Sequence, residues 1–350
     1  MTTTTAATTT MPAATITTAA SVPQGCIYIM SRPHSGSTIL DIMLSGGDQV
    51  AGCGEIVMGM DNDPATWRCS CGRVLLECPA WAPVIAALES QGVAWRGLAA
   101  ETVAQADKTS LWRTWRARPA AAAAGTDGDL DRLAASTRAL FAAIRAATGK
   151  SHVLDSSKVP SRGLFLAKYL PETCLVHIVR HPLGCVASHY WRLKIGDTYL
   201  AQRRPYHGPL RPLAYVEAAA MWLAGNLAYE LIARVNPSRA IRIRYEDLCA
   251  RPRDELDRLG ATLGVPVAGV AERVAGDAAF STGHMLGGNP VRHEGKVAFD
   301  PSRQERRAPL PLAVRLLVLL ICWPLMLRYG YLASPMSHLA PRVGPQASRG

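Results

Sequence analysis

An apolar run that breaks into a loop of small residues and then resumes as a helical pattern constrains this chain more than any other feature. Ile27-Tyr28-Ile29-Met30 has the composition of a buried strand, and Ile39-Leu40-Asp41-Ile42-Met43-Leu44 has helical spacing. Between them lies Ser31-Arg32-Pro33-His34-Ser35-Gly36-Ser37-Thr38. A Gly/Ser turn at the N-terminus of a helix directs backbone N–H groups and the positive end of the helix dipole at one point. The segment therefore predicts a site for a phosphate or a sulfate.

The same loop argues against ordinary ATP chemistry. It lacks the Gly-Lys-Ser/Thr ending of a Walker A nucleotide loop. A plain strand–turn–helix crossover without a ligand is the alternative interpretation, since such crossovers are common. A second anion-binding motif elsewhere in the chain would favour a ligand site.

A second strand–turn–helix segment supplies that motif. Cys174-Leu175-Val176-His177-Ile178-Val179 is a buried-strand pattern that ends at Arg180, and a helix carrying Ser188 follows. Arginine offers a planar fork of donors and serine adds a hydroxyl, so the two side chains can converge on one anionic group. The alternative is an arginine that is simply ion-paired at the end of a strand.

Two anion sites on one sheet suit a nucleotide that is phosphorylated at two separate positions. In these motifs the sequence resembles the sulfotransferases that use 3′-phosphoadenosine-5′-phosphosulfate (PAPS). The loop at residues 34–38 looks like their 5′-phosphosulfate loop, and Arg180 and Ser188 look like their 3′-phosphate pair. The resemblance implies that the donor is PAPS. No metal is required if cations and N–H dipoles surround the bridging oxygen.

Three further segments extend the resemblance to roughly residues 24–332. Leu154-Asp155-Ser156-Ser157-Lys158 resembles a second-strand segment of bacterial members, and Arg244-Tyr245-Glu246-Asp247-Leu248 resembles a later strand-end motif. Residues 284–292 resemble the C-terminal loop that covers the nucleotide, and His284 at its start is interpreted as structural. The resemblance implies these donor-binding residues: Arg32, His34, Ser35, Gly36, Ser37, Thr38, Arg180, Ser188, Tyr245, Asn289 and Arg292.

Sulfuryl transfer needs a base for the acceptor hydroxyl and positive charge at the departing phosphate oxygen. Glu55 is the predicted base, because tyrosylprotein sulfotransferases carry a similar Cys-Gly-Glu segment. Lys158 is predicted to cover the leaving oxygen. Many family members place an arginine or lysine where this chain has His34, so either His34 or Arg32 takes the role of the loop cation. For Glu55 the alternative is a solvated or helix-capping residue, and for Lys158 it is a surface lysine at the start of a helix.

The order of elements predicts an α/β fold with a central parallel sheet flanked by helices, which is the P-loop NTPase-like sulfotransferase fold. Strands are expected at 26–30, 152–155, 174–179 and 240–244, and an amphipathic helix at 129–147. One domain is predicted at 23–333, with 56–150 inserted as a cap, between a disordered Thr/Ala-rich tail at 1–22 and a flexible tail at 334–350. The segment 196–212 is either an acceptor-binding loop or a solvated surface loop.

Four cysteines form a conspicuous group. Cys69, Cys71 and Cys78 lie close together in sequence, with Cys53 upstream. They bind zinc, form a disulfide or only pack, and a similar CxCG…CPxW stretch in bacterial sulfotransferases favours a shared structural element. The nine cysteines are odd in number and mostly isolated, as in a reduced cytoplasmic protein.

The formal net charge of +11 favours anionic partners. No recognised nucleic-acid module is found, so PAPS and a hydroxyl-bearing acceptor are the expected partners and nucleic acid is not. The apolar run 316–327 is too short to cross a bilayer of ~30 Å. It predicts a buried C-terminal helix, or else a peripheral membrane contact through 312–332 by a membrane-associated protein.

The predicted function is transfer of a sulfuryl group from PAPS to a hydroxyl of a carbohydrate, glycolipid or small metabolite. A P-loop kinase is one alternative, and it would need a lysine in the first loop and a carboxylate for Mg²⁺. The other is a non-catalytic, membrane-peripheral nucleotide-binding protein.

Overall fold

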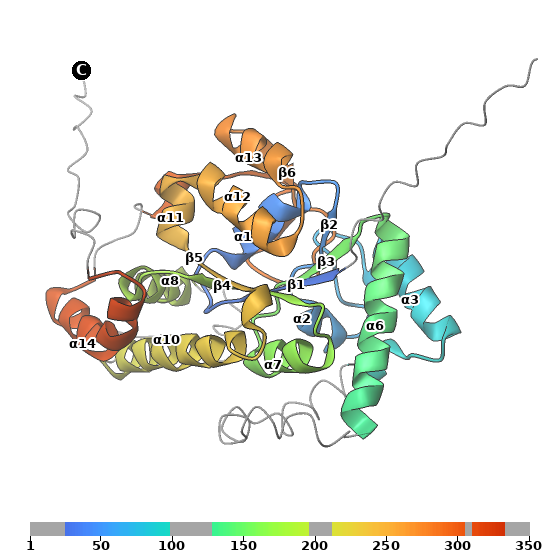
Figure 1. Cartoon of the computed structure of the whole chain (residues 1–350), viewed down its shortest axis with the longest axis horizontal. Helices are drawn as coiled ribbons and strands as arrows, with labels where there is room; N and C mark the ends of the chain where they lie inside the picture. The colour runs from blue at the N-terminus through green and yellow to red at the C-terminus, as the bar shows by residue number, and fades with distance from the viewer. Residues whose placement is uncertain (1–24, 99–127, 196–211, 305–309, 333–350) are drawn as a thin grey trace, which may run out of the picture.

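The core of the molecule is a parallel sheet of five strands in the order β2-β3-β1-β4-β5 (Figure 1). In this computed structural model, residues 25–98, 128–195, 212–304 and 310–332 are described. The strands are β1 (Gly25–Met30), β2 (Val50–Gly52), β3 (His152–Asp155), β4 (Cys174–Val179) and β5 (Ala240–Arg244). Helices flank both faces, which confirms the predicted fold class.

The central strands are mostly apolar because helices cover both of their faces. Every residue of β1, β3 and β4 is buried. In the register, Ile27 of β1 lies opposite Leu154 of β3 and Cys174 of β4. The carboxyl ends of these three strands therefore meet at one edge of the sheet, where both predicted anion motifs begin.

Strand β2 is absent from the sequence prediction. It has only three residues, too few to show a periodic pattern, and it pairs with β3 so that Gly52 lies opposite Leu154. Glu55 therefore follows a strand of the main sheet. The same edge of the sheet thus receives Glu55.

Alternate residues of the strands enter two separate apolar cores. One core contains Ile27 and Ile29 with α1 (Ser37–Ser45), α11 (Tyr245–Ala250), α12 (Pro252–Leu263) and α13 (Ala268–Ala275). The other contains Tyr28 and Met30 with α2 (Ile56–Met60), α3 (Trp81–Ser90), α6 (Gly128–Thr148) and α7 (Pro160–Tyr169). Helix α6 confirms the helix expected at 129–147.

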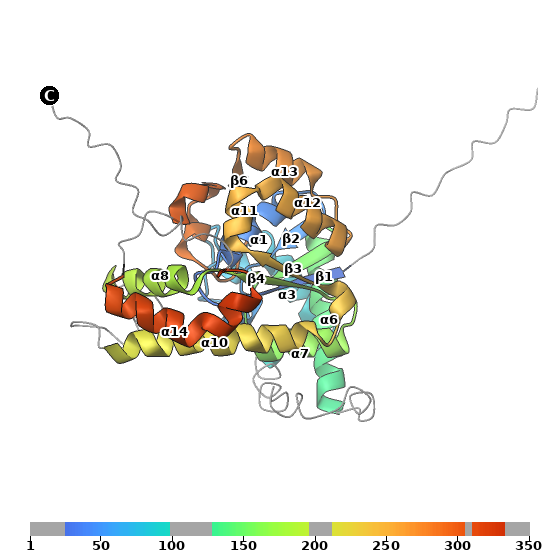
Figure 2. The ribbon, with the colours of Figure 1, turned by 60° about the vertical axis from the view of Figure 1, so that its left-hand side comes forward.

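A third apolar core joins α8 (Pro182–Ile195), α10 (Pro212–Ala233) and α14 (Leu312–Arg328), and Figure 2 shows α14 lying along the other two. Within the described segments, no helix is both long and apolar enough to cross a membrane. The predicted tails 1–22 and 334–350 and the loop residues 196–211 lie outside the described residues.

The C-terminal part adds a small hairpin of β6 (Ala279–Ser281) and β7 (Lys296–Ala298), which pair antiparallel. Short 3-10 turns occur at η1 (Leu75–Glu77), η3 (Pro237–Arg239), η4 (Pro290–His293) and η5 (Pro301–Gln304). The connection between β6 and β7 holds the segment predicted to cover a nucleotide.

Candidate active site

The first loop is held in shape by a glycine and a tyrosine. Gly36 caps α1 with a φ of 93°, a conformation that L side chains rarely adopt. A Cβ at this position would lie 2.3 Å from Cδ2 of Tyr245. Glycine is therefore required both for the turn and for the close approach of Tyr245, which begins α11 directly after β5.

Arg180 joins the second motif to the first. Its Nη1 donates a hydrogen bond to the backbone carbonyl of His34 over 3.1 Å, and its guanidinium lies 4.8 Å from the ring centre of Tyr245. Arg180 is only 5% exposed. No ion pair found within the described segments includes it. A buried charge without a counter-charge is costly, so this position suits an anionic ligand.

The two candidate loop cations point to different neighbours. The Arg32 side chain packs against α10. A Cβ placed on Gly225 of this helix would lie 2.3 Å from Cδ of Arg32. The ring of His34, a residue with a φ of 72°, is 5.7 Å from the ring of His189. Ser188, next to His189 in α8, is buried.

His189 also lies beside the first loop, and no pattern in the sequence pointed to it. Burial, and then the charge of Arg32, lower its pKa, so its imidazole is held neutral. It was missed because only the packing of α8 against the loop brings it to His34; no spacing in the sequence signals that contact.

Glu55 and Lys158 form an ion pair in which both side chains are 14% exposed. Glu55 is the N-cap residue of α2, and Lys158 follows β3 with a φ of 62°. The hydroxyl of Tyr229 lies 2.6 Å from the carbonyl oxygen of Lys158 and 3.0 Å from that of Ser31. Lys158 is thereby fastened beside the start of the first loop.

Buried polar contacts hold the segment that carries Lys158 in place. Asp155 makes a buried ion pair with Arg162 over 2.7 Å. The hydroxyl of Ser156 donates to the Asp41 carboxylate of α1 over 2.7 Å, and burial raises the pKa of Asp41 to about 7. The Ser157 hydroxyl accepts a hydrogen bond from the backbone N–H of Val57 over 3.0 Å. The carboxyl end of β3 is thus tied to both helices next to the site.

The C-terminal segment lies over the first loop and over Glu55. The backbone N–H of Asn289 donates to the Thr38 hydroxyl over 3.2 Å, while the Asn289 side chain accepts from Val291 in η4. The N–H of Glu55 donates to the Gly287 carbonyl over 3.4 Å. Burial lowers the pKa of Arg292, and its Nε has no hydrogen-bond partner among the described residues.

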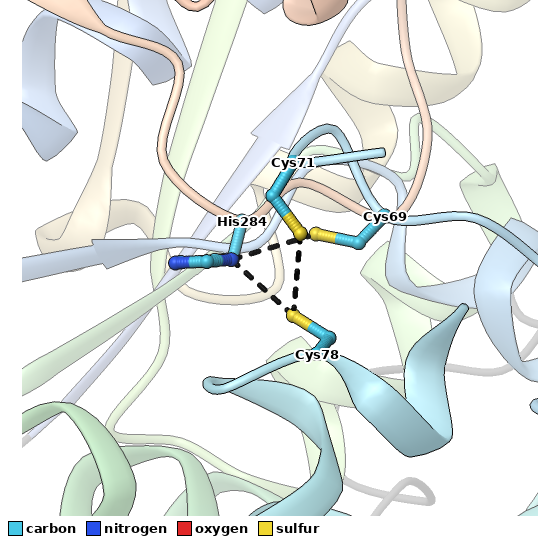
Figure 3. A group of neighbouring side chains, drawn as sticks. All are labelled: Cys69, Cys71, Cys78 and His284. Atoms are coloured by element: carbon cyan, nitrogen blue, oxygen red, sulfur yellow. Dashed lines mark hydrogen bonds between the residues drawn. The ribbon is translucent and has the colours of Figure 1, made fainter. Parts of the chain in front are cut away.

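The cysteine group differs from the predicted one. Cys69, Cys71 and Cys78 come together with His284 (Figure 3). Cys53 is not a member, because its thiol donates to the Ala51 carbonyl over 3.5 Å beside the sheet. A hydrogen bond from Cys69, together with His284 and backbone N–H groups, lowers the pKa of the Cys78 thiol. His284 was missed as a partner because it lies far away in sequence and comes close only when the loop folds back.

Comparison with known proteins supplies the family. A family model described as the sulfotransferase family matches residues 26–269. The chain belongs to the sulfotransferase family. Membership supports the predicted transferase and disfavours the kinase alternative. No curated protein matches the sequence.

Solved structures with similar chains are also sulfotransferases, though distant ones. The sulfotransferase domain from the curacin biosynthetic pathway is 18% identical, with a TM-score of 0.48 over 87% of this chain and 97% of that one. The domain from the Synechococcus PCC 7002 olefin synthase is 18% identical, with a TM-score of 0.45 over 87% and 94%. A sulfotransferase from Alicyclobacillus acidocaldarius is 13% identical, with a TM-score of 0.43 over 90% and 98%.

Proposed function

We propose that this sulfotransferase moves a sulfuryl group from PAPS to a hydroxyl of a carbohydrate, glycolipid or small-metabolite acceptor. One observation carries the proposal: the buried Arg180 guanidinium is linked to the first loop through the His34 carbonyl. The two predicted anion-binding segments are therefore in direct contact, which supports one continuous site. A donor with phosphate groups at both its 3′ and 5′ ends has the charge distribution that such a site would take.

The donor would be held by groups from four segments. The loop Ser35-Gly36-Ser37-Thr38 at the N-terminus of α1 would bind the 5′-phosphosulfate with backbone N–H groups, with Arg32 and His34 beside it. Arg180 and Ser188 would bind the 3′-phosphate. Tyr245 would lie against the nucleotide, and Asn289 and Arg292 would cover it. When bound, PAPS supplies an activated sulfuryl group.

Glu55 would act as the base and Lys158 as the cation for the leaving oxygen. A carboxylate placed at the acceptor hydroxyl can take its proton as the bond to sulfur forms, which contributes about 10²–10⁴-fold. A lysine ammonium at the departing phosphate oxygen neutralises the charge that develops there. Their ion pair holds both side chains at the edge of the sheet. These groups perform the reaction with no metal among them.

Isothermal titration calorimetry with adenosine 3′,5′-bisphosphate and with ATP tests the donor. We expect clearly tighter binding of the bisphosphate, because only this ligand places a phosphate at Arg180. Equal affinity for the two nucleotides would contradict the proposal and favour a nucleotide site of another kind. Sulfur-labelled PAPS with panels of carbohydrates, glycolipids and small hydroxyl metabolites then tests the acceptor class.

Helix α14 supports the peripheral membrane contact. Leu312, Leu316, Leu320, Trp323 and Leu327 form an apolar stripe with exposures from 52% to 71%. The opposite face, with Val318, Cys322 and Met326, is buried against neighbouring helices. We take the occupant of the stripe to be an anionic lipid surface, because the chain carries a formal charge of +11. The nine cysteines, which form no disulfide within the described residues, support a reducing, cytoplasmic location.

A further inference from the structure

Three cysteines and one histidine from distant parts of the chain converge outside the proposed catalytic groups (Figure 3). Cys69 and Cys71 lie in a tight turn, Cys78 precedes α3, and His284 follows β6. The three Sγ atoms and one ring nitrogen of His284 all lie within 4.8 Å of one another. Such a set of three cysteines and one histidine is typical of a structural zinc site.

Three of the six distances between the ligand atoms are close to those of a tetrahedron around one ion. Sγ of Cys71 is 3.8 Å from Sγ of Cys78, and Nδ1 of His284 is 3.3 Å from Sγ of Cys78 and 3.7 Å from Sγ of Cys69. Zinc–sulfur bonds of ~2.3 Å and zinc–nitrogen bonds of ~2.0 Å place ligand atoms about 3.5–3.8 Å apart. We propose that Cys69, Cys71, Cys78 and His284 bind a structural zinc ion.

The backbone around these ligands forms a built site. Gly72, with a φ of 87°, closes the turn, and its N–H donates to the Cys69 carbonyl over 2.9 Å. On the other side, Trp81 Nε1 donates to the His284 carbonyl over 2.7 Å. The Ser70 hydroxyl donates to the Gly283 carbonyl over 2.8 Å. The ligand residues are thus already oriented by hydrogen bonds that do not use their sulfur or ring-nitrogen atoms.

A disulfide accounts for less of this geometry. It would join two of the three sulfur atoms and leave the third cysteine and His284 without a reason to converge. Four protein ligands also leave no open position on the ion, so the zinc would stabilise the structure and would not bind substrate.

The site would fasten the insertion to the loop that covers the nucleotide. Two residues after His284, the N–H of Leu286 donates to the Cys53 carbonyl over 2.8 Å, and the loop then reaches Glu55 and Thr38. Zinc binding would therefore position the segment that carries Asn289 and Arg292.

Metal analysis of the purified full-length protein tests the zinc site. We expect about one equivalent of zinc by plasma mass spectrometry, and less than about a tenth of an equivalent would overturn the proposal. The variants Cys78→Ser and His284→Ala should lose the metal, whereas the control Cys174→Ala, a buried thiol of β4, should keep it. Retention of zinc by the first two variants would also overturn the proposal.

A second measurement covers the case in which those variants do not fold. The wild-type protein, stripped with a chelator and reloaded with Co²⁺, should show thiolate-to-cobalt charge-transfer absorption. Absence of this absorption would contradict the site. So would an intact mass lowered by two hydrogens, which would show a disulfide among the three cysteines. These readouts do not depend on sulfuryl transfer, so failure of the zinc site and failure of the proposed function are separable.

Discussion

At the scale of single residues, Arg180 is the most informative side chain, because it is buried, is joined to the first loop and carries a charge. We expect Arg180→Ala to weaken binding of adenosine 3′,5′-bisphosphate about tenfold to a hundredfold, since a hydrogen bond to a charged group contributes ~1.5–3 kcal/mol. Calorimetry measures this change, with Arg258→Ala on α12 as the control. An unchanged dissociation constant would remove Arg180 from the site.

Glu55 tests the chemistry separately from binding. We expect Glu55→Gln to lower the turnover number by about 10²–10⁴, since the amide cannot accept the proton of the acceptor. Affinity for the bisphosphate should stay nearly unchanged. Transfer from labelled PAPS is the measurement, and Glu89→Gln on the exposed side of α3 is the control. Full activity in Glu55→Gln would show that another group is the base.

Asp41 predicts a pH dependence of stability. Burial raises its pKa to about 7, whereas an unfolded aspartate titrates near ~3.9. Between these two pKa values, Asp41 is therefore more often protonated in the folded state than in the unfolded state. The stabilisation that this proton gives is complete below the unfolded pKa and is lost as the pH rises to the folded pKa of about 7. Over this range the free energy of unfolding falls by at most about 1.4 kcal/mol per pH unit.

Urea unfolding of Asp41→Asn across this range measures the effect. The free energy of unfolding of wild type minus that of the variant should fall with rising pH. Burial lowers the pKa of His177 and of His181 to about 4, which acts in the opposite direction. Both histidines are present in both proteins, so they cancel in the difference. A pH-independent difference would assign Asp41 an ordinary pKa.

At the scale of elements, α14 shows how one helix can have two apolar faces. Its buried face packs on α8 and α10, and its exposed stripe has no polar cover in the described structure. We expect the double variant Leu320→Glu/Trp323→Glu to reduce sedimentation with anionic phospholipid vesicles severalfold, because charged side chains oppose burial at the interface. Leu76→Glu, on η1, is the control. Equal sedimentation of the three proteins would exclude α14 as the contact.

The elements also explain which sequence predictions succeeded. Strands β1 and β4 were predictable from their long apolar runs, β3 from a shorter apolar segment, and β5 from the alternation of isoleucine with arginine. β2 was not, because three residues carry too little information. Its omission hid the reason why Glu55 reaches the same edge of the sheet as Lys158.

At the scale of the whole molecule, the proposed donor site joins segments that lie far apart in the chain: the loop before α1, the start of α8 and the loop after β6. A ligand that binds across them should stabilise the entire fold. At a hundredfold excess over its dissociation constant, the bisphosphate should add about 2.7 kcal/mol to the free energy of unfolding. Thermal unfolding should show a higher midpoint with the bisphosphate than with equal ATP. No shift would mean that it does not bind the folded protein.

Part of the candidate site could be predicted from the sequence, because some of its requirements are local. The first loop and Arg180 were recognisable because each requirement is local: a glycine where φ is positive, and an arginine at the end of an apolar strand. The positions of His189 and His284 could not be recognised from the sequence, and neither could the exclusion of Cys53 from the cysteine group. Each depends on a contact between segments that are distant in sequence.

Local chemistry along the chain was thus sufficient to indicate the strands, the anion-binding turns and the family. The meeting of Glu55 with Lys158, of Arg180 with the His34 carbonyl and of three cysteines with His284 came only from the folded molecule. The physical reason is that hydrophobic periodicity and backbone preferences act over a few residues. Which side chains meet is set instead by the strand order β2-β3-β1-β4-β5 and by the packing of helices around it.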